Sequence, residues 1–309
     1  MDERGLAEFQ THRARLLGLA YRMLGELSEA EDIVQDAYLR WRTAHDVATP
    51  AAWLTTVVTN LCLSRLTSAR ARRERYVGPW LPEPLLTDDA HDPQDMAAQK
   101  DTLSLGFLVL LEKLSPPERA AFVLRTAFDY THREIADILR IDEAHARQLY
   151  HRARARVGDP RRRFTTSPEQ SAKLVERFLA ASVDGDVAGL ERVLTDDVTV
   201  WADGGGKVSA AARPIAGRGD VARYLAGLAS TARGQAATFT MAEVNGAPSI
   251  FVWEGEALTA VLVPEVHGER IGGVRAILNP DKLAHLVRRS RQLLHSARSV
   301  PSRSSNTAR

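Results

Sequence analysis

The hydrophobic and polar positions of residues 130–157 predict two short helices joined by a tight turn. Thr131 and Glu134 have the spacing of a capping box, so the first helix should begin there. Residues 140–142 break the pattern, and Asp142 is placed to cap the second helix. Apolar residues at helical spacing face inward, and the outer face of the second helix is basic. That outer face carries His145, Arg147, Gln148, His151, Arg152, Arg154 and Arg156.

A short helix, a turn and a helix with a basic outer face form the layout of a helix-turn-helix. Arginine can fork onto guanine and glutamine onto adenine, while further arginines neutralise phosphate. The alternative is a solvated basic helix in an all-α domain. Because the capping box, the turn and the one-sided arginines agree, we favour a helix that reads DNA.

The first 75 residues also have helical periodicity, in stretches at residues 6–24 and 30–41. Ser28 and Glu31 form another expected capping box, which should open the second of these helices. Pro50 begins a third helix that is apolar at first and strongly basic at its end. The outer face of the second helix, which alone would be interpreted as a solvated surface, carries Asp32, Gln35, Asp36 and Arg40.

Residues 76–100 are rich in proline and acidic side chains, a composition that predicts a linker without regular structure. The first half of this linker is too apolar for a plain spacer. The residues that we expect to dock on another surface are Trp80, Leu81, Leu85 and Leu86. Helical periodicity resumes at residues 101–128, where Ser115 followed by Pro116 marks a helix start.

After a second short linker at residues 161–168, the pattern changes from helical to mixed. Helices are expected within residues 172–194 and at residues 217–231. Alternating segments separated by turn signals predict strands at residues 198–201, 238–244, 249–253, 257–266 and 272–278. A short final helix follows Asn279, and the basic tail after it should be disordered. Helices followed by mostly antiparallel strands indicate an α+β domain.

Composition excludes several classes of protein. With Cys62 as the single cysteine in 309 residues, neither a disulfide framework nor a cysteine zinc site can form. No apolar run approaches the roughly 20 residues that span a bilayer, and residues 1–16 lack the apolar core of a signal peptide. The net charge of +2 is small, but arginine is clustered locally. We therefore expect a cytoplasmic protein without a membrane partner, a metal or a cofactor.

Three passages in the first 160 residues resemble the extracytoplasmic-function (ECF) sigma factors, the smallest sigma subunits of bacterial RNA polymerase. Residues 28–41 (SEAEDIVQDAYLRW) are similar to the sigma domain 2 helix that docks on the polymerase clamp. Residues 50–66 (PAAWLTTVVTNLCLSRL) are similar to the next helix, which engages the promoter −10 element. The helix-turn-helix and the helix before it are similar to sigma domain 4. The passages match the family in their local sequence, and they also match it in their order and separation along the chain.

The linker text YVGPWLPEP, the DGGGK turn at residues 203–207 and the NPDKL segment at residues 279–283 resemble a subgroup with a fused C-terminal SnoaL-like domain. That extension is thought to replace control by a separate anti-sigma protein. The implied fold is multidomain: two all-α sigma domains, the second with the helix-turn-helix, and an α+β SnoaL-like domain shaped like a cone. The expected boundaries are sigma domain 2 at 1–75, a linker at 76–100, sigma domain 4 at 101–160, a short linker at 161–168, the regulatory SnoaL-like domain at 169–288 and a disordered basic tail at 289–309.

The resemblance implies two partners: core RNA polymerase, through its β′ clamp and β flap, and promoter DNA. The polymerase-binding residues would be Asp32, Gln35, Asp36 and Arg40. The residues at the −10 element would be Trp53, Asn60, Arg65 and Arg70. Those at the −35 element would be Arg147, Gln148, His151, Arg152 and Arg154, with Arg154 and Arg156 nearer phosphate. Regulatory contacts would involve Trp80, Leu81, Asp203, Lys207, Asn279, Pro280 and Asp281. Leu149 stands where many members have a basic residue, so the preferred −35 bases are not implied.

Other functions are open to the C-terminal domain. Some SnoaL-like relatives are enzymes, and the residues that could line a pocket for a substrate or small ligand are Trp201, Asp203, Lys207, Trp253 and Arg275. A buried Asp203 could act as a base, but aspartate is also common at glycine-rich turns for backbone reasons. We favour intramolecular regulation, in which the linker docks on this domain and sets the separation of the two sigma domains. A ligand-responsive repressor that uses the helix-turn-helix alone leaves residues 28–66 unexplained.

Overall fold

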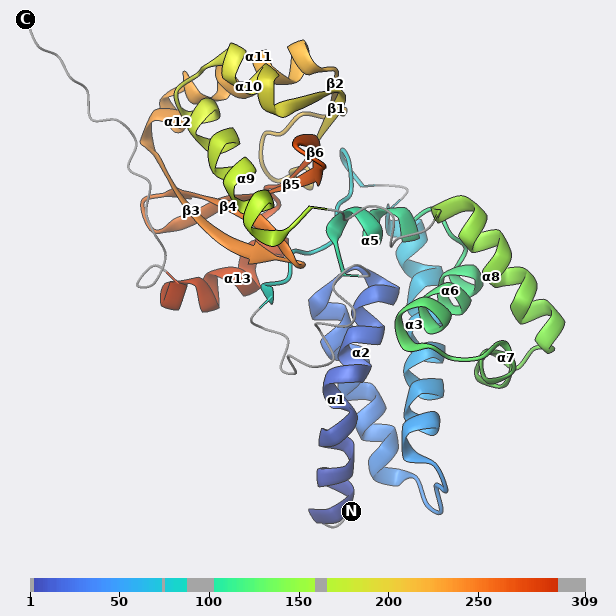
Figure 1. Ribbon diagram of the computed structural model, residues 1–309. Helices are drawn as coiled ribbons and strands as arrows, with labels where there is room; N and C mark the ends of the chain where they lie inside the picture. Colours follow the sequence, from blue (N-terminus) through green and yellow to red (C-terminus); the bar gives the residue numbers. More distant parts are fainter. Residues whose placement is uncertain (1–2, 74–75, 88–102, 159–165, 294–309) are drawn as a thin grey trace, which may run out of the picture. The chain divides into compact units, whose positions relative to one another are not determined.

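The computed structural model describes residues 3–73, 76–87, 103–158 and 166–293, and the chain divides into two compact units (Figure 1). The first unit comprises Met1–Arg75 and Asp89–Arg161, and the second comprises Tyr76–Asp88 and Arg162–Arg309. The first part of the expected linker therefore belongs to the C-terminal unit.

Three long helices open the first unit: α1 (Glu3–Leu24), α2 (Leu27–Thr43) and α3 (Pro50–Arg73). They pack on one another through their apolar faces, and α3 begins at the expected proline. The expected capping box at Ser28 is wrong, because Glu26 is the N-cap and Ser28 lies in the first turn of α2. Gly25, with a φ of 73°, turns the chain directly after α1, so that Leu27 enters the core as the first helical residue.

Four shorter helices complete the described part of this unit: α5 (Leu105–Leu111), α6 (Pro116–Phe128), α7 (His132–Leu139) and α8 (Glu143–Val157). The capping box of α7 is present, since Thr131 Oγ1 accepts from Glu134 N at 3.2 Å and Glu134 Oε2 accepts from Thr131 N at 2.7 Å. Arg140 ends α7 in the left-handed conformation with φ 56°, and Asp142 accepts from His145 N at 2.7 Å. The predicted helix-turn-helix is confirmed.

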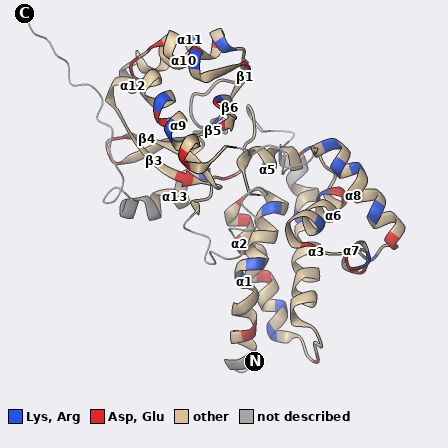
Figure 2. Ribbon diagram, in the orientation of Figure 1, with Lys and Arg blue, Asp and Glu red and all other residues tan. Residues whose placement is uncertain are grey.

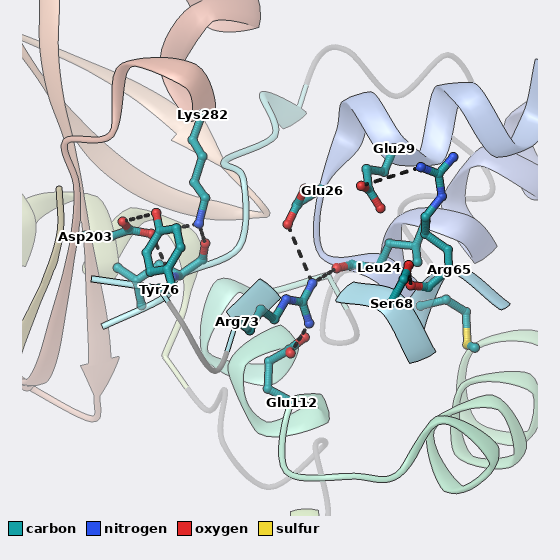
Figure 3. A network of polar contacts seen from close by, with 12 residues as sticks. Leu24, Glu26, Glu29, Arg65, Ser68, Arg73, Tyr76, Glu112, Asp203 and Lys282 are labelled. Atoms are coloured by element: carbon teal, nitrogen blue, oxygen red, sulfur yellow. Dashed lines mark hydrogen bonds and ion pairs between the residues drawn. The ribbon is translucent and has the colours of Figure 1, made fainter. Parts of the chain in front are cut away.

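The two helical groups pack against each other within the first unit, where α6 contacts α1 and α3, and α7 contacts α3. Arg119 of α6 is buried, donates to the Met23 carbonyl at 2.8 Å and pairs with Glu112 at 2.8 Å. Arg73, at the end of α3, pairs with the same Glu112 carboxylate and donates to the Leu24 carbonyl at 2.5 Å (Figure 3). Two guanidinium groups thus satisfy carbonyl groups that the end of α1 leaves without helical partners.

The second unit combines helices with one six-stranded sheet. Its elements in chain order are α9 (Pro168–Val183), α10 (Val187–Val193), β1 (Leu194–Asp203), β2 (Ile215–Ala216), α11 (Arg218–Ala229), α12 (Ala232–Ala236), β3 (Ala237–Val244), β4 (Ala247–Glu254), β5 (Ala257–His267), β6 (Arg270–Ile277) and α13 (Pro280–Leu293). The strand order is β2-β1-β6-β5-β4-β3, with β1 and β6 parallel and the other neighbours antiparallel. The predicted fold class, helical domains followed by an α+β domain, is confirmed.

The core of the second unit lies between α9, α10 and α11 and one face of the sheet, and it includes Phe178, Val200 and Val274. Successive side chains of a strand point to opposite faces. The side chains of Asp203 at the end of β1 and of Arg275 in β6 therefore lie on the other face. Asp203 and Arg275, two of the residues expected to line a pocket, are thus separated from this hydrophobic core.

The last helix is longer than expected. α13 ends at Leu293, so residues 289–293, which were expected to begin the disordered tail, are helical. Leu283 and Leu286 are buried, and α13 packs against β5, which stabilises the helix. The remaining tail, residues 294–309, and most of the acidic half of the linker lie outside the described residues. In the part of the chain that is described, no helix is long and apolar enough to cross a membrane, and no group of His, Cys, Asp and Glu could hold a metal ion.

Candidate nucleic-acid interface and linker-binding site

The outer face of α8 is exposed and basic, as Figure 2 shows by the blue Lys and Arg positions along this helix. Its exposed polar side chains are His145, Arg147, Gln148, His151, Arg152, Arg154 and Arg156. The inward stripe is buried and consists of Ala146, Leu149, Ala153 and Val157. Leu149 is therefore a core residue and presents no side chain to a ligand of the outer face. The predicted −35 residues lie together on one surface.

A buried carboxylate holds two of these arginines. Glu118 of α6 is 4% exposed, and its Oε2 accepts from Ser115 N at 3.1 Å and from Ser115 Oγ at 2.8 Å. Arg152 Nε lies 3.4 Å from Glu118 Oε1, and Arg156 Nη1 lies 2.5 Å from Glu118 Oε2. Burial acts to raise the pKa of the Glu118 carboxyl, but the Ser115 hydrogen bonds and then Arg156 and Arg152 lower it below its ordinary value. Glu118 is missing from the predicted site, because its helix-capping pattern reveals nothing about a partner on another helix.

His132 lies beside the predicted DNA contact His151. The rings of His132 and His151 are 6.5 Å apart, and His132 also contacts the ring of Tyr150. Burial, followed by the charges of Arg125 and Arg147, lowers the pKa of His132 below its ordinary value. The uncharged form of His132 is therefore favoured more than in an ordinary histidine.

The residues predicted to bind the polymerase are all exposed on α2, and they are Asp32, Gln35, Asp36 and Arg40. Leu39 lies among them and is 49% exposed. The opposite side of α2 is buried in the first unit through Ala30, Ile33, Val34 and Ala37. This helix therefore presents a mixed surface of charged side chains and one exposed leucine.

The residues predicted for the −10 element lie on α3. Trp53 and Asn60 are half-buried and seven positions apart, which places them on the same side of the helix. Arg65 Nη1 lies 3.8 Å from Glu29 Oε1 of α2, and its side chain is 33% exposed. The side chain of Arg70 lies outside the described residues. The structure thus places Trp53 and Asn60 on one side of α3, about two turns apart, and pairs Arg65 with a neighbouring acid.

The carboxylate of Asp203 binds the first part of the linker (Figure 3). Asp203 is 0% exposed and accepts from Tyr76 Oη at 2.6 Å, Leu81 N at 2.9 Å, Gly205 N at 3.1 Å and Lys282 Nζ at 2.8 Å. A carboxylate has about four acceptor positions, so this set of donors fills them. Two of the donors belong to the linker, and the other two belong to the C-terminal domain.

Lys282 of α13 connects the same carboxylate to the linker backbone. Its Nζ also donates to the Leu81 carbonyl at 2.5 Å, and the side chain is 8% exposed. The ammonium group lies 4.3 Å from the centre of the Trp80 ring and 4.9 Å from that of Tyr76. A buried charge is tolerated when it is paired and hydrogen-bonded, and Lys282 meets that condition through Asp203 and the Leu81 carbonyl.

The linker has a second point of attachment further along. His285 of α13 directs Nε2 at the Pro84 carbonyl, 2.6 Å away, and Nδ1 at Glu83 Oε1, 2.8 Å away. Asn245 donates its backbone N–H to the Leu85 carbonyl at 2.8 Å and accepts from Leu85 N at 2.9 Å through Oδ1. Asn245 has a φ of 52°, a conformation that asparagine adopts more readily than most residues.

The predicted regulatory residues fall into two groups. Those that meet at the linker-binding site are Trp80, Leu81, Asp203 and Asn279, the last through its Nδ2 at 2.8 Å from Tyr76 Oη. Lys207 and Asp281 instead pair with each other at 2.5 Å, with side chains 52% and 66% exposed, and Pro280 begins α13. Residues that sequence reasoning missed are Tyr76, Asn245, Lys282 and His285, although Tyr76 and Lys282 stand within the quoted linker and NPDKL passages.

Three of the residues expected to line a ligand pocket, Asp203, Trp253 and Arg275, make contacts within the protein. Asp203 has its acceptor positions filled, so it is not free to take a proton from a substrate. Trp253 donates to Thr240 Oγ1 at 2.9 Å, and the Arg275 guanidinium lies 4.7 Å from the centre of the Trp201 ring. These contacts are structural, and they do not favour the enzyme interpretation of the C-terminal domain.

Comparison with known proteins identifies both helical groups. Residues 9–72 match the family model for Sigma-70 region 2, and residues 105–157 match the model for Sigma-70, region 4. The chain is 41% identical over 226 residues to the ECF RNA polymerase sigma factor SigJ of Mycobacterium tuberculosis, which covers 72% of each chain. It is 30% identical over 282 residues to the probable ECF RNA polymerase sigma factor SigI of the same species, which covers 90% of this chain and 94% of SigI.

The similarity extends to a solved structure of this relative. The crystal structure of the Mycobacterium tuberculosis extracytoplasmic function sigma factor SigJ superposes with a TM-score of 0.73 at 35% sequence identity. The match covers 90% of this chain and 98% of the SigJ chain. The likeness therefore includes the C-terminal helix-plus-sheet unit as well as the two helical groups.

Proposed function

Because the chain belongs to the ECF sigma factors of bacterial RNA polymerase, we propose that its C-terminal domain controls promoter recognition by binding the linker between regions 2 and 4. Family membership establishes a sigma factor, which binds core polymerase and promoter DNA. The repressor interpretation is not favoured, since it has no use for region 2. A sigma factor acts on the transcribing polymerase, so we also place the action of this protein in the cytoplasm, without a membrane partner.

We assign the −35 element to the outer face of α8. Arg147, Gln148 and His151 would contact base edges, since arginine and glutamine make bidentate contacts in the major groove. The exposure of this face and its separation from the buried stripe support the assignment. Region 4 would also contact the β flap of the polymerase, so that α8 is held at the promoter.

We assign the −10 element to the side of α3 that carries Trp53 and Asn60, together with the basic residues Arg65 and Arg70. An aromatic ring and an amide on one side of a helix suit an unstacked base, whose extrusion costs a few kcal/mol. The exposed face of α2, with Asp32, Gln35, Asp36 and Arg40, would bind the β′ clamp. This assignment is supported by the charged and amide side chains that surround the exposed Leu39 on α2.

Regulation in cis rests on one observation, the binding of Tyr76 and Leu81 by the buried carboxylate of Asp203. An extended chain spans at most about 3.3 Å per residue, so a free linker over residues 74–104 could reach about 100 Å. With residues 76–87 bound to the C-terminal domain, residues 88–104 alone could reach only about 55 Å. Linker binding therefore limits how far regions 2 and 4 can separate when they bind two promoter elements, and no separate anti-sigma protein is required for that limit.

In vitro transcription with core polymerase and a promoter library tests this proposal. Full-length protein, an Asp203→Asn variant and a chain ending at Pro168 would be compared on the promoters that the wild type selects. We expect Asp203→Asn to shift promoter output in the same direction as the truncation, because both release the linker. A suitable control is Arg223→Gln, which removes a surface ion pair with Asp220 in the same domain.

Two results would count against the proposal. Output from Asp203→Asn that equals the wild type, together with a changed output from the truncation, would show that the domain acts without binding the linker. Core-independent binding to duplex DNA without promoter-specific transcripts would instead remove the sigma assignment for this chain.

A further inference from the structure

The arginines of α8 lie on two flanks of the helix. At 3.6 residues per turn, Arg152 and Arg156 are four positions apart and share one flank, whereas Arg147 and Arg154 are seven apart and share the other. A helix about 10–12 Å wide fills a major groove about 12 Å wide. The flank of Arg152 and Arg156 then faces the phosphates of one DNA strand, whereas residues near the start of the helix, including Arg147, face the bases.

The two flanks differ in how firmly their arginines are held. Arg147 pairs with Glu143 at 2.8 Å, but both side chains are about half exposed, and such surface pairs are weak. On the other flank, Arg152 and Arg156 share the Glu118 carboxylate, whose side chain is only 5% exposed. That carboxylate is itself fixed by Ser115 N and Oγ at the start of α6.

The outer sides of the held arginines are still open to solvent. The Arg152 and Arg156 side chains are 53% and 52% exposed. A guanidinium group has five N–H donors, and Glu118 is bound through Nε of Arg152 and Nη1 of Arg156. Donors directed outward from each fork can therefore bind phosphate without breaking the pair to Glu118.

We propose that Glu118 is a positioning residue for promoter binding, which holds Arg152 and Arg156 in the orientation that contacts the DNA backbone beside the −35 bases. This inference rests on the assignment of α8 to the −35 element and moves Arg152 from base reading to phosphate binding. Immobilising a long side chain when DNA binds costs conformational entropy. The ion pairs with Glu118 hold both arginines before DNA binds, so this cost is reduced. One buried carboxylate shared by two arginines also leaves this flank with a net positive charge.

The sign of the effect of Glu118→Gln separates this inference from simple charge competition. If Glu118 only neutralised the arginines, its removal would tighten DNA binding and steepen the salt dependence, because two cations would be released for phosphate. If Glu118 positions them, Glu118→Gln should weaken promoter binding about five-fold. The slope of log affinity against log salt should then become shallower by about one to two.

The measurement is binding of the full-length holoenzyme to a promoter that the wild type selects, titrated between about 50 and 200 mM salt. The variants are Glu118→Gln, Arg152→Gln with Arg156→Gln, and the triple combination. Glu134→Gln is a matched control, since Glu134 occupies the same capping position in α7 and bonds Thr131 N and Oγ1 at 2.7 Å each. The pair of arginine substitutions should weaken binding, and adding Glu118→Gln should cause no further loss.

If Glu118→Gln bound the promoter as tightly as the wild type or more tightly, the inference would be overturned. It would also be overturned if Glu118→Gln weakened binding equally when Arg152 and Arg156 are both replaced, because Glu118 would then act only as a helix cap. A loss of similar size from Glu134→Gln would overturn it as well. These results leave the sigma assignment intact, provided that the wild type selects promoters with a −35 element. A wild type that selects none would refute both the proposed function and this inference.

Discussion

Replacing Lys282 by methionine tests the linker-binding site most directly. The substitution keeps an unbranched side chain of similar length but removes the charge. It breaks the pair with Asp203 at 2.8 Å and the hydrogen bond to the Leu81 carbonyl at 2.5 Å. It also removes the cation that lies over the rings of Trp80 and Tyr76.

The expected magnitude follows from the burial of the pair. Asp203 is 0% exposed and the Lys282 side chain 8%, and breaking such a pair by removing one partner costs about 3–5 kcal/mol. Asp203 keeps its bonds from Tyr76, Leu81 and Gly205, so we expect the lower end, about 3 kcal/mol. Release of the linker would let water reach Asp203, and the loss should therefore appear first as detachment of residues 76–87.

Hydrogen exchange measured by mass spectrometry reports this detachment. The amides of Leu81 and Leu85 both donate to side chains of the C-terminal domain. A loss of about 3 kcal/mol should raise their exchange rates by about 100-fold. Peptides from β4 and β5 serve as the internal reference, because these two strands pair with each other and not with the linker.

The double variant Asp203→Asn with Lys282→Met provides a second check. It removes both charges, so it should protect Leu81 better than Lys282→Met alone, in which a carboxylate is left without its cation. Unchanged exchange of residues 76–87 in Lys282→Met would refute the argument. Equal acceleration throughout the sheet would also refute it, since Lys282 would then stabilise the domain and not the bound linker.

Three further predictions concern the first unit. Arg119→Ala should lower the free energy of unfolding of this unit by about 3 kcal/mol, because it leaves the Met23 carbonyl without a charged donor; an unchanged denaturant midpoint would contradict this. The pKa of Glu118 is lowered in the folded protein, so the stability it contributes is complete above its ordinary value of 4.5 and is lost as the pH falls below it. The stability of the Glu118→Gln variant should not show that loss when the pH is lowered. Identical curves of stability against pH for the variant and the wild type would contradict this prediction. Arg147→Ala should reduce discrimination at one −35 position by about 1–3 kcal/mol, seen in transcription from base-substituted promoters, whereas an equal decrease on every promoter would argue for phosphate contact.

The local elements of this protein could be predicted because their signals lie within a few residues of one another. The capping box at Thr131, the cap at Asp142 and the inward stripe of α8 each involve positions three or four apart, and the helix start at Ser115 was indicated by the proline next to it. Where the local signal competed with packing, the prediction was wrong. Ser28 has a capping-box pattern, but the turn at Gly25 and the burial of Leu27 start the helix two residues earlier.

The partners of the linker could not be predicted in the same way. Its apolar residues indicated that the linker docks, and the DGGGK and NPDKL passages indicated that it docks on the C-terminal domain. Neither pattern indicated which atoms are in contact. Tyr76 is 127 positions from Asp203 and 203 positions from Asn279, and Lys282 is 201 positions from Leu81. Composition suggested a linker because proline and acidic residues disfavour regular structure, and residues 81–85 indeed form no helix or strand.

By itself, the sequence determined the helices, the helix-turn-helix and the α+β character of the C-terminal domain, because periodicity and capping depend on neighbouring residues. Only the tertiary structure shows that Asp203 is a buried hydrogen-bond acceptor for the linker, because a glycine-rich turn is typical of the protein surface. It also decided that Glu118 holds two arginines of another helix. Burial and charge pairing depend on which distant segments pack together, and no spacing along the chain contains that information.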